Sequence, residues 1–299
     1  MNDKKLNILV TGANGQLGRC LRDESVGSRN RFIFTDVSEL PGLETTYLDI
    51  CNADALDIVA DSENVDVIIN CAGYTNVDKA EDETHLAELL NHVAASNLAA
   101  TARRRGALLI HISTDYIFGG DACAPIREDA APAPLGVYGA TKLAGEDAVR
   151  CSACRHIIIR TAWMYSKYGK NFMKTMLSLS ASHENLKVVC DQIGTPTYAP
   201  DLAKFIVGVI DGGKMEHTGT YHYTGEGVCS WYDFAYAIVR RTGNKCKVNP
   251  CRTEDYPTRA RRPHYSVLDK SLVKSVFGIE LPHWSESLDH CFQELKNDN

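Results

Sequence analysis

The sequence contains no apolar run that approaches the roughly 18 residues of a transmembrane helix. It also has no excess of positive charge, because 32 basic residues face 38 acidic ones and the formal net charge is -6. This balance argues against a nucleic-acid surface or a polybasic membrane contact. The first residues, Met1 to Lys5, show no export signal before the first apolar segment. We therefore expect a cytoplasmic protein with neither nucleic acid nor membrane as a partner.

A disulfide framework is lacking as well. The 11 cysteines are odd in number and scattered, and three of them lie within apolar runs: Cys71, Cys190 and Cys291. This pattern is typical of reduced core thiols. Cys151 and Cys154 form the one close pair, but a zinc ribbon needs a second pair of matching spacing. We predict no metal site, and the sequence leaves open whether these two cysteines have any role.

The remaining composition is that of an ordinary globular protein. Hydrophobic residues make up 44% and charged residues 23% of the 299 residues, which is enough chain for one large or two smaller domains. No internal repeat or low-complexity tract interrupts it.

A glycine motif follows the first apolar run. The strand-like segment 6–10 leads directly into Gly12, Gly15 and Gly18, and a helix-compatible stretch begins at Gly15. Glycines at this spacing between a strand and a helix allow a tight turn and a close approach of the backbone to a pyrophosphate. The free N–H groups of the helix then favour the anion. The simpler alternative is a glycine turn without a ligand.

Asp36 closes the second predicted strand, 31–36. A carboxylate in this place can accept hydrogen bonds from the adenosine ribose and would repel a 2′-phosphate. It therefore favours NADH, although Ser38 and the basic side chains upstream leave NADPH open. The alternative is a surface aspartate that caps a loop.

Strands and helices alternate over residues 6–161, which predicts a doubly wound parallel sheet of the Rossmann type. We expect residues 1–162 to form a dinucleotide-binding domain to which 186–212 returns. Residues 163–185 and 213–299 would form a smaller C-terminal α+β domain that binds the substrate. Small residues, Ala72 and Gly73, end one strand where a cofactor could pass, and the strand 107–116 ends in polar residues. Ligands bind at the carboxyl ends of such strands.

Tyr138 and Lys142 are four residues apart and therefore share one face of a predicted helix. A lysine ammonium in this position can lower the pKa of a phenol, so that Tyr138 acts as a general acid near neutral pH. A hydroxyl of Thr114, or else Ser113, would donate a hydrogen bond to a carbonyl oxygen that gains charge. With a nicotinamide cofactor these groups predict reduction of a carbonyl by hydride transfer.

These motifs resemble the short-chain dehydrogenase/reductase superfamily in its extended form, and more closely the dTDP-4-dehydrorhamnose reductases. The matching segments are 12–18, 76–81, 113–118, 138–142, 160–163, 191–197 and 262–269. Segments 12–18 and 138–142 are shared across the superfamily. Ser113-Thr114-Asp115-Tyr116 and Asp191-Gln192-x-Gly194-x-Pro196-Thr197 are far more specific.

The resemblance implies reduction of dTDP-4-dehydro-L-rhamnose to dTDP-L-rhamnose, a precursor of cell-surface polysaccharide, with NADH or NADPH. It implies that Thr114, Tyr138 and Lys142 are catalytic, and that Asp115, Tyr116 and Trp163 also face the sugar. The resemblance also implies a set of residues that face the cofactor. Gly12, Gly18, Tyr138 and Lys142 belong to it, together with Gly15, Gln16, Leu17, Asp36, Asp49, Ile50, Ala72, Gly73 and Thr75.

Some members of the family form a magnesium-bridged dimer through a glutamate early in the first helix. Cys20 stands at about that position here, so we expect no Mg²⁺ site, while a homodimer remains possible.

Three points stay open. The rival enzyme is another nucleotide-sugar reductase or epimerase. The rival from a different class is a regulatory subunit similar to the beta subunit of methionine adenosyltransferase. The basic loop with Arg259, Arg261 and Arg262 could bind phosphates or form salt bridges.

Overall fold

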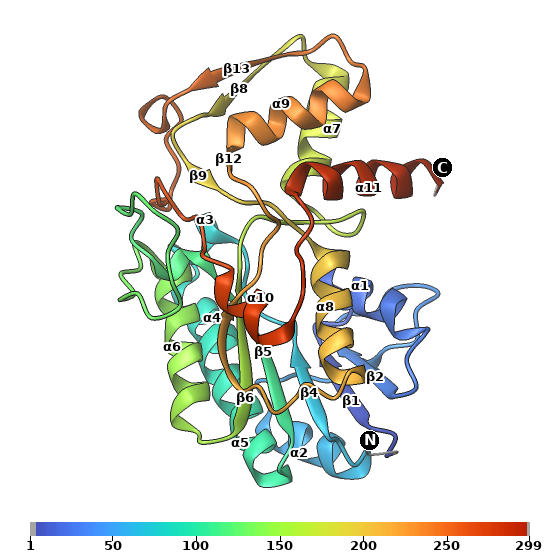
Figure 1. The fold of residues 1–299 in the computed structure, drawn as a ribbon. Coiled ribbons are helices and arrows are strands. Elements are labelled where there is room, and N and C mark those ends of the chain that lie inside the picture. Colours follow the sequence, from blue (N-terminus) through green and yellow to red (C-terminus); the bar gives the residue numbers. More distant parts are fainter. Residues whose placement is uncertain (1–3, 298–299) are drawn as a thin grey trace.

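A computed structural model describes residues 4–297 of the chain (Figure 1). Its centre is a seven-stranded sheet in which all neighbours are parallel, with the order β11-β6-β5-β4-β1-β2-β3. The strands are β1 (Asn7–Thr11), β2 (Arg31–Asp36), β3 (Thr46–Tyr47), β4 (Val67–Asn70), β5 (Leu108–Thr114), β6 (Arg155–Thr161) and β11 (Gly219–His222). The order reverses between β1 and β4, as in doubly wound folds. The predicted fold class is confirmed.

Helices cover both faces of the sheet because its central strands are buried on both sides. On one face, α1 (Gln16–Ser25), α8 (Ala199–Asp211) and α10 (Ser271–Phe277) share a core with the strands. On the other face, α2 (Ala53–Ser62), α5 (Ala94–Arg105) and α6 (Val137–Cys151) do the same.

The helical segment before β5 is irregular, although its apolar spacing predicts one long helix over 83–105. Short α3 (Val77–Ala80) and α4 (Thr84–Glu88) are followed by one π-helical turn, Leu89–Val93, before α5 begins. The widened turn buries Asn91, which is 1% exposed. π turns are often found at functional sites.

The smaller region lies above the carboxyl ends of the strands in Figure 1. It contains three helices, α7 (Phe172–Ser182), α9 (Trp231–Thr242) and α11 (Trp284–Asn297). Its short strands form three pairs: β7 (Met164–Tyr165) with β10 (Thr197–Tyr198), β9 (Ile193–Gly194) with β12 (Cys229–Ser230), and β8 (Asn185–Val189) with β13 (Lys247–Cys251). Buried aromatic rings, among them Tyr165 and Phe234, form its core.

Two segments differ from the division expected from the sequence. β8 pairs with β13 in the smaller region, whereas only α8 of the segment 186–212 packs on the large sheet. β11, expected in the smaller region, instead extends the large sheet next to β6. The alternating strand pattern could not show this, because both choices depend on pairing between distant segments. The boundary between the two proposed domains remains a prediction.

No helix among residues 4–297 is both long and apolar enough to cross a membrane. All 11 cysteines are free, with Cys151 exposed and Cys154 buried. Within the same residues, no group of three or more His, Cys, Asp or Glu side chains is arranged to hold a metal ion. Cys20 is buried in the core beneath α1.

Candidate active site

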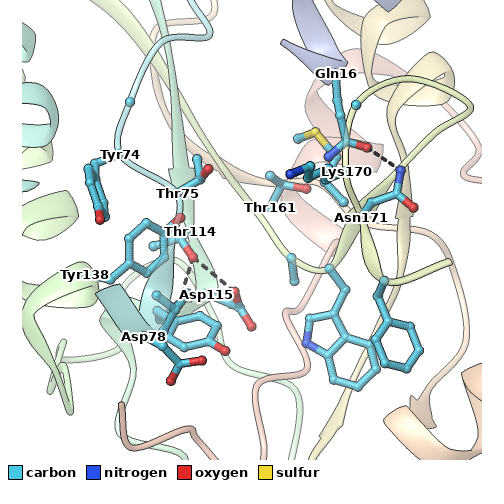
Figure 2. A pocket seen from close by; sticks show the side chains of 18 of the residues that line it. Gln16, Tyr74, Thr75, Asp78, Thr114, Asp115, Tyr138, Thr161, Lys170 and Asn171 are labelled. Atoms are coloured by element: carbon cyan, nitrogen blue, oxygen red, sulfur yellow. Dashed lines mark hydrogen bonds between the residues drawn. The ribbon is translucent and has the colours of Figure 1, made fainter. Parts of the chain in front are cut away.

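The smaller region and the carboxyl edge of the sheet enclose a cleft of about 1270 Å³. Most of the predicted site residues line it: Gly12, Gly15, Gln16, Leu17, Asp36, Ala72, Gly73, Thr75, Thr114, Asp115, Tyr116, Tyr138, Lys142 and Trp163. Figure 2 shows Thr114, Asp115 and Tyr138 on one side of it, with Gln16, Lys170 and Asn171 across from them. Residues that are far apart in the sequence are therefore brought to one cavity.

In the glycine turn, no side chain covers the backbone at one end of the cleft. Gly12 has φ +65°, and a Cβ there would come within 2.6 Å of the Ala72 backbone nitrogen. Gly15 caps α1 without any side-chain hydrogen bond to its first turn. The backbone N–H groups in the first turn of α1 are therefore available to an anion in the cleft.

Three predicted cofactor residues do not line the cleft. A Cβ on Gly18 would lie 2.4 Å from the Gly12 carbonyl oxygen, so this glycine allows helix and turn to pack closely. Ile50 is 4% exposed and belongs to the core, and the Asp49 carboxylate accepts a hydrogen bond of 2.9 Å from the Cys51 backbone. Their predicted contact with a cofactor remains untested.

Asp36 does line the cleft, and its carboxylate is held in place. One oxygen accepts a hydrogen bond of 3.0 Å from the Asn14 backbone. The other accepts from the Ser38 backbone at 3.0 Å and from the Ser38 hydroxyl at 2.8 Å. The Ser38 hydroxyl, which sequence reasoning left available to a phosphate, is thus engaged by Asp36.

Thr114 ends β5 and lies among the predicted catalytic groups. Its hydroxyl donates a hydrogen bond of 3.1 Å to Asp115 Oδ1 and accepts one of 3.2 Å from the Tyr116 backbone (Figure 2). The Tyr116 ring meets the Tyr138 ring edge-on, with 5.5 Å between their centroids. The two tyrosines and the hydroxyl thus form one contiguous group.

The electrostatics of Tyr138 differ from the prediction. Burial raises the pKa of Tyr138 to about 12, and the nearby charge of Asp115 raises it as well, while a hydrogen bond with Thr114 lowers it. Lys142 is not among the groups that lower the pKa of Tyr138, and its ammonium donates a hydrogen bond of 2.6 Å to the Ile112 carbonyl. Burial in turn lowers the pKa of Lys142 to about 8.

Asp115 is a buried carboxylate at the cleft. It is 1% exposed, and its Oδ2 atom has no hydrogen-bond partner among residues 4–297. Burial raises the pKa of Asp115 to about 6, because the charged form is poorly solvated. A buried acceptor of this kind is costly unless a ligand satisfies it.

An aromatic wall lies on the opposite side. Trp163 has the unusual φ of +47° and stacks on Trp231 with 3.6 Å between ring centroids. Gly194 makes room for it, since a Cβ there would lie 2.7 Å from the Trp163 ring. Phe172 adds a third ring, 4.5 Å from Trp231. Sequence reasoning missed Trp231 and Phe172, which are the first residues of α9 and α7.

The basic loop forms salt bridges. Arg262 donates to both carboxylate oxygens of Asp78, at 3.2 and 2.7 Å, and Arg259 pairs with Asp82 at 2.6 Å. Both arginines nevertheless line the cleft. The loop is therefore attached to the segment around α3 and still faces the cavity.

Asn91 is a further residue that sequence reasoning missed. From the π turn it accepts a hydrogen bond of 2.9 Å from the Tyr74 backbone and donates to Tyr74 O and Thr141 Oγ1, both at 3.1 Å. It thus ties the strand end beneath the cleft to α6. The sequence signal that could have found it is an asparagine within an apolar helical pattern.

A doubly wound sheet, a glycine turn at a helix start and a Tyr138/Lys142 helix beside Thr114 together define an NAD(P)-dependent short-chain dehydrogenase/reductase. Comparison with known proteins narrows this class. Residues 6–297 match the family model described as the RmlD substrate binding domain. The dTDP-4-dehydrorhamnose reductase of Aggregatibacter actinomycetemcomitans is 40% identical over 290 residues, which cover 94% of this chain and 96% of that protein.

Solved structures agree. A dTDP-4-dehydrorhamnose reductase from Clostridium acetobutylicum superposes with a TM-score of 0.91 at 44% identity, covering 97% of this chain and 100% of that one. The same enzyme from Bacillus anthracis, in complex with NADP, gives 0.88 at 37% identity with coverage of 97% and 100%. The chain belongs to the dTDP-4-dehydrorhamnose reductase family. The predicted family and enzyme class are thereby confirmed, whereas the roles of individual site residues stay predictions.

Proposed function

We propose that this protein reduces the 4-keto group of dTDP-4-dehydro-L-rhamnose to a hydroxyl, giving dTDP-L-rhamnose, with NADH or NADPH as the reductant. The observation that carries the proposal is the meeting of Thr114, Tyr138 and Lys142 in one cleft with the bare glycine turn. Membership of the family supplies the sugar nucleotide.

The residues at the turn fit a dinucleotide. The positive φ of Gly12 and the uncapped first turn of α1 suit a pyrophosphate. Lys142, which lines the same cleft, would bond the nicotinamide ribose. The bound nicotinamide would supply the hydride. Since the Asp36 carboxylate would repel a 2′-phosphate, we propose NADH as the preferred form, although a relative binds NADP.

The chain's own residues would handle the proton. With its pKa raised to about 12, Tyr138 is protonated at neutral pH and serves as the general acid for the carbonyl oxygen as this oxygen gains charge. Lys142, whose ammonium donates to the Ile112 carbonyl, would act through the nicotinamide ribose and not by shifting the pKa of the phenol. Thr114 would fix the orientation of the phenol through the hydrogen bond that joins them.

The remaining lining residues suit a nucleotide sugar. The unpaired Oδ2 atom of Asp115 would accept a hydrogen bond from a sugar hydroxyl, and the Trp163 ring would cover an apolar face of the sugar. Arg259 and Arg262 would balance the negative charge of the diphosphate.

The test is direct. The purified protein is mixed with dTDP-4-dehydro-L-rhamnose and either reduced cofactor, and the loss of nicotinamide absorbance is followed while the product is identified by NMR. We expect turnover to dTDP-L-rhamnose, faster with NADH. Cofactor binding without turnover of this sugar would refute the proposal and favour a regulatory subunit. Turnover confined to another sugar would indicate a different nucleotide-sugar reductase or epimerase.

A further inference from the structure

Glu146 lies one helical turn beyond Lys142 on the face of α6 that also carries Tyr138. Its side chain is 0% exposed, although carboxylates are seldom fully buried without partners. Arg160 of β6 donates to its two oxygens at 3.0 and 2.9 Å, and Arg150 donates to Oε2 at 2.5 Å. Glu146 is thus an ionised group enclosed behind the catalytic pair.

Arg160 is itself fixed from several sides. It is 3% exposed, and it donates a hydrogen bond of 3.0 Å to the Glu128 backbone carbonyl. Its guanidinium lies 3.3 Å from His222 Nε2 on β11 and over the Phe118 ring, 5.4 Å from the centroid. A planar guanidinium held by three segments can fix a carboxylate in one geometry.

Lys142 needs a counter-charge that its hydrogen bond does not supply. Lys142 is 6% exposed, and its ammonium donates a hydrogen bond to the neutral Ile112 carbonyl. Glu146 is the strongest influence that opposes the lowering of the pKa of Lys142 by burial, followed by Cys71. Burial raises the pKa of the Cys71 thiol far above its usual value, so this group is uncharged at neutral pH. The remaining counter-charge is Glu146.

The other titratable groups around Lys142 do not replace it. His111 on β5 is neutral, because burial lowers its pKa well below 6.5. Tyr138 is neutral below its pKa of about 12. Arg150 and Arg160 are permanently positive and disfavour a third cation. Asp115, with a pKa raised to about 6, carries a negative charge at neutral pH beside Tyr138.

We propose that Glu146 is a positioning residue: held by Arg160, its carboxylate keeps the Lys142 ammonium charged and in place on the Tyr138 face of α6. The effect of Glu146 on the reaction rate rests on the reduction proposed above. Its effect on the protonation of Lys142 can be measured without that reaction.

The test measures Lys142 directly. The protein is labelled with ε-¹³C-lysine, the Lys142 signal is assigned by its loss in Lys142→Ala, and its chemical shift is followed against pH. In Glu146→Gln we expect the pKa of Lys142 to fall by about 1 unit or more, the effect of losing a nearby opposite charge. Asp147→Asn is the matched control, since this adjacent carboxylate is 61% exposed and should leave Lys142 unchanged.

The pH dependence of kcat is the second readout. If protonated Lys142 supports the reaction, activity is present below the pKa of Lys142 and is lost as pH rises through it. Glu146→Gln should therefore lose activity at lower pH than the wild type, with about 5-fold less kcat near pH 8, approaching about 10-fold at higher pH, and little change near pH 6. If Glu146 had a purely structural role, Glu146→Gln would lower the stability of the protein without shifting the pH at which kcat is lost.

An unchanged Lys142 pKa in folded Glu146→Gln would overturn the inference. If that variant does not fold, Glu146→Asp keeps the charge but withdraws it by one methylene, and the pKa of Lys142 should still fall. An unchanged pKa of Lys142 in Glu146→Asp would also overturn the inference. Should the wild type reduce no keto sugar, the proposed function fails while the NMR titration still decides the role of Glu146.

Discussion

The Thr114 hydroxyl gives its hydrogen bond to Asp115 Oδ1, at 3.1 Å, rather than to the space in the cleft. A hydroxyl has only one proton to donate. As long as the ionised Asp115 carboxylate accepts this hydrogen bond, Thr114 can accept a hydrogen bond from the Tyr138 phenol but cannot donate one to a substrate carbonyl oxygen. The side chain expected to donate to the carbonyl is therefore controlled by its neighbour in the sequence.

Asp115→Asn should stabilise the folded protein at neutral pH. The folded pKa of Asp115 is raised to about 6, so the stability that the protonated carboxyl provides is present below about pH 4 and is lost as pH rises through 6. The neutral amide avoids this loss, and we expect a gain of about 1–3 kcal/mol at pH 8. Urea unfolding at pH 4 and pH 8 checks it. A variant that is less stable than the wild type at pH 8 would contradict it.

Tyr138→Phe removes the proposed general acid and leaves the ring in place. We expect kcat to fall by about 100- to 10,000-fold, the contribution typical of a positioned acid. Cofactor binding, followed by nicotinamide fluorescence, should be retained. Tyr236→Phe is the control, because this tyrosine of α9 is 47% exposed and lies outside the cleft lining. A near wild-type kcat in Tyr138→Phe would remove Tyr138 from the mechanism.

Asp36→Asn should shift the cofactor preference towards NADPH. The amide oxygen can still accept the bonds from Asn14 or Ser38, but the charge that would repel a 2′-phosphate is gone. We expect the ratio of kcat/KM for NADPH to that for NADH to rise at least about 10-fold, or about 1.4 kcal/mol. Asp54→Asn changes an exposed carboxylate of α2 outside the cleft lining and should leave this ratio as it is. Equal ratios in all three proteins would count against the role of Asp36.

Gly194→Ala tests the aromatic wall. The new methyl group would lie 2.7 Å from the Trp163 ring and must displace it from Trp231. We expect a higher KM for the sugar nucleotide and a changed near-ultraviolet circular dichroism spectrum. Gly208→Ala is the matched control, since a Cβ there meets nothing within 4 Å. Within α8 that change should add up to about 1 kcal/mol of stability without affecting KM. An unaltered spectrum in Gly194→Ala would show that the stack tolerates the methyl group.

Local patterns identified most of the site. The glycine spacing after the first strand and the four-residue interval between Tyr138 and Lys142 depend only on turn and helix geometry, which neighbouring residues determine. The parallel sheet followed from the alternation of strands and helices. Three predicted cofactor residues, Gly18, Asp49 and Ile50, are outside the cleft lining, because a motif places a segment near a ligand without deciding which side chains face it.

The sequence by itself determined the strands of the sheet up to residue 161, the nucleotide turn and the spacing of the catalytic pair, since these arise from short-range backbone preferences and hydrophobic periodicity. Only the tertiary structure decided which neighbours surround that pair. Trp231 meets Trp163, Asn91 joins Tyr74 to α6, and Arg160 meets Glu146 through contacts between distant segments. Burial, which depends on the whole packed chain, then raised the pKa of Tyr138 and lowered that of Lys142.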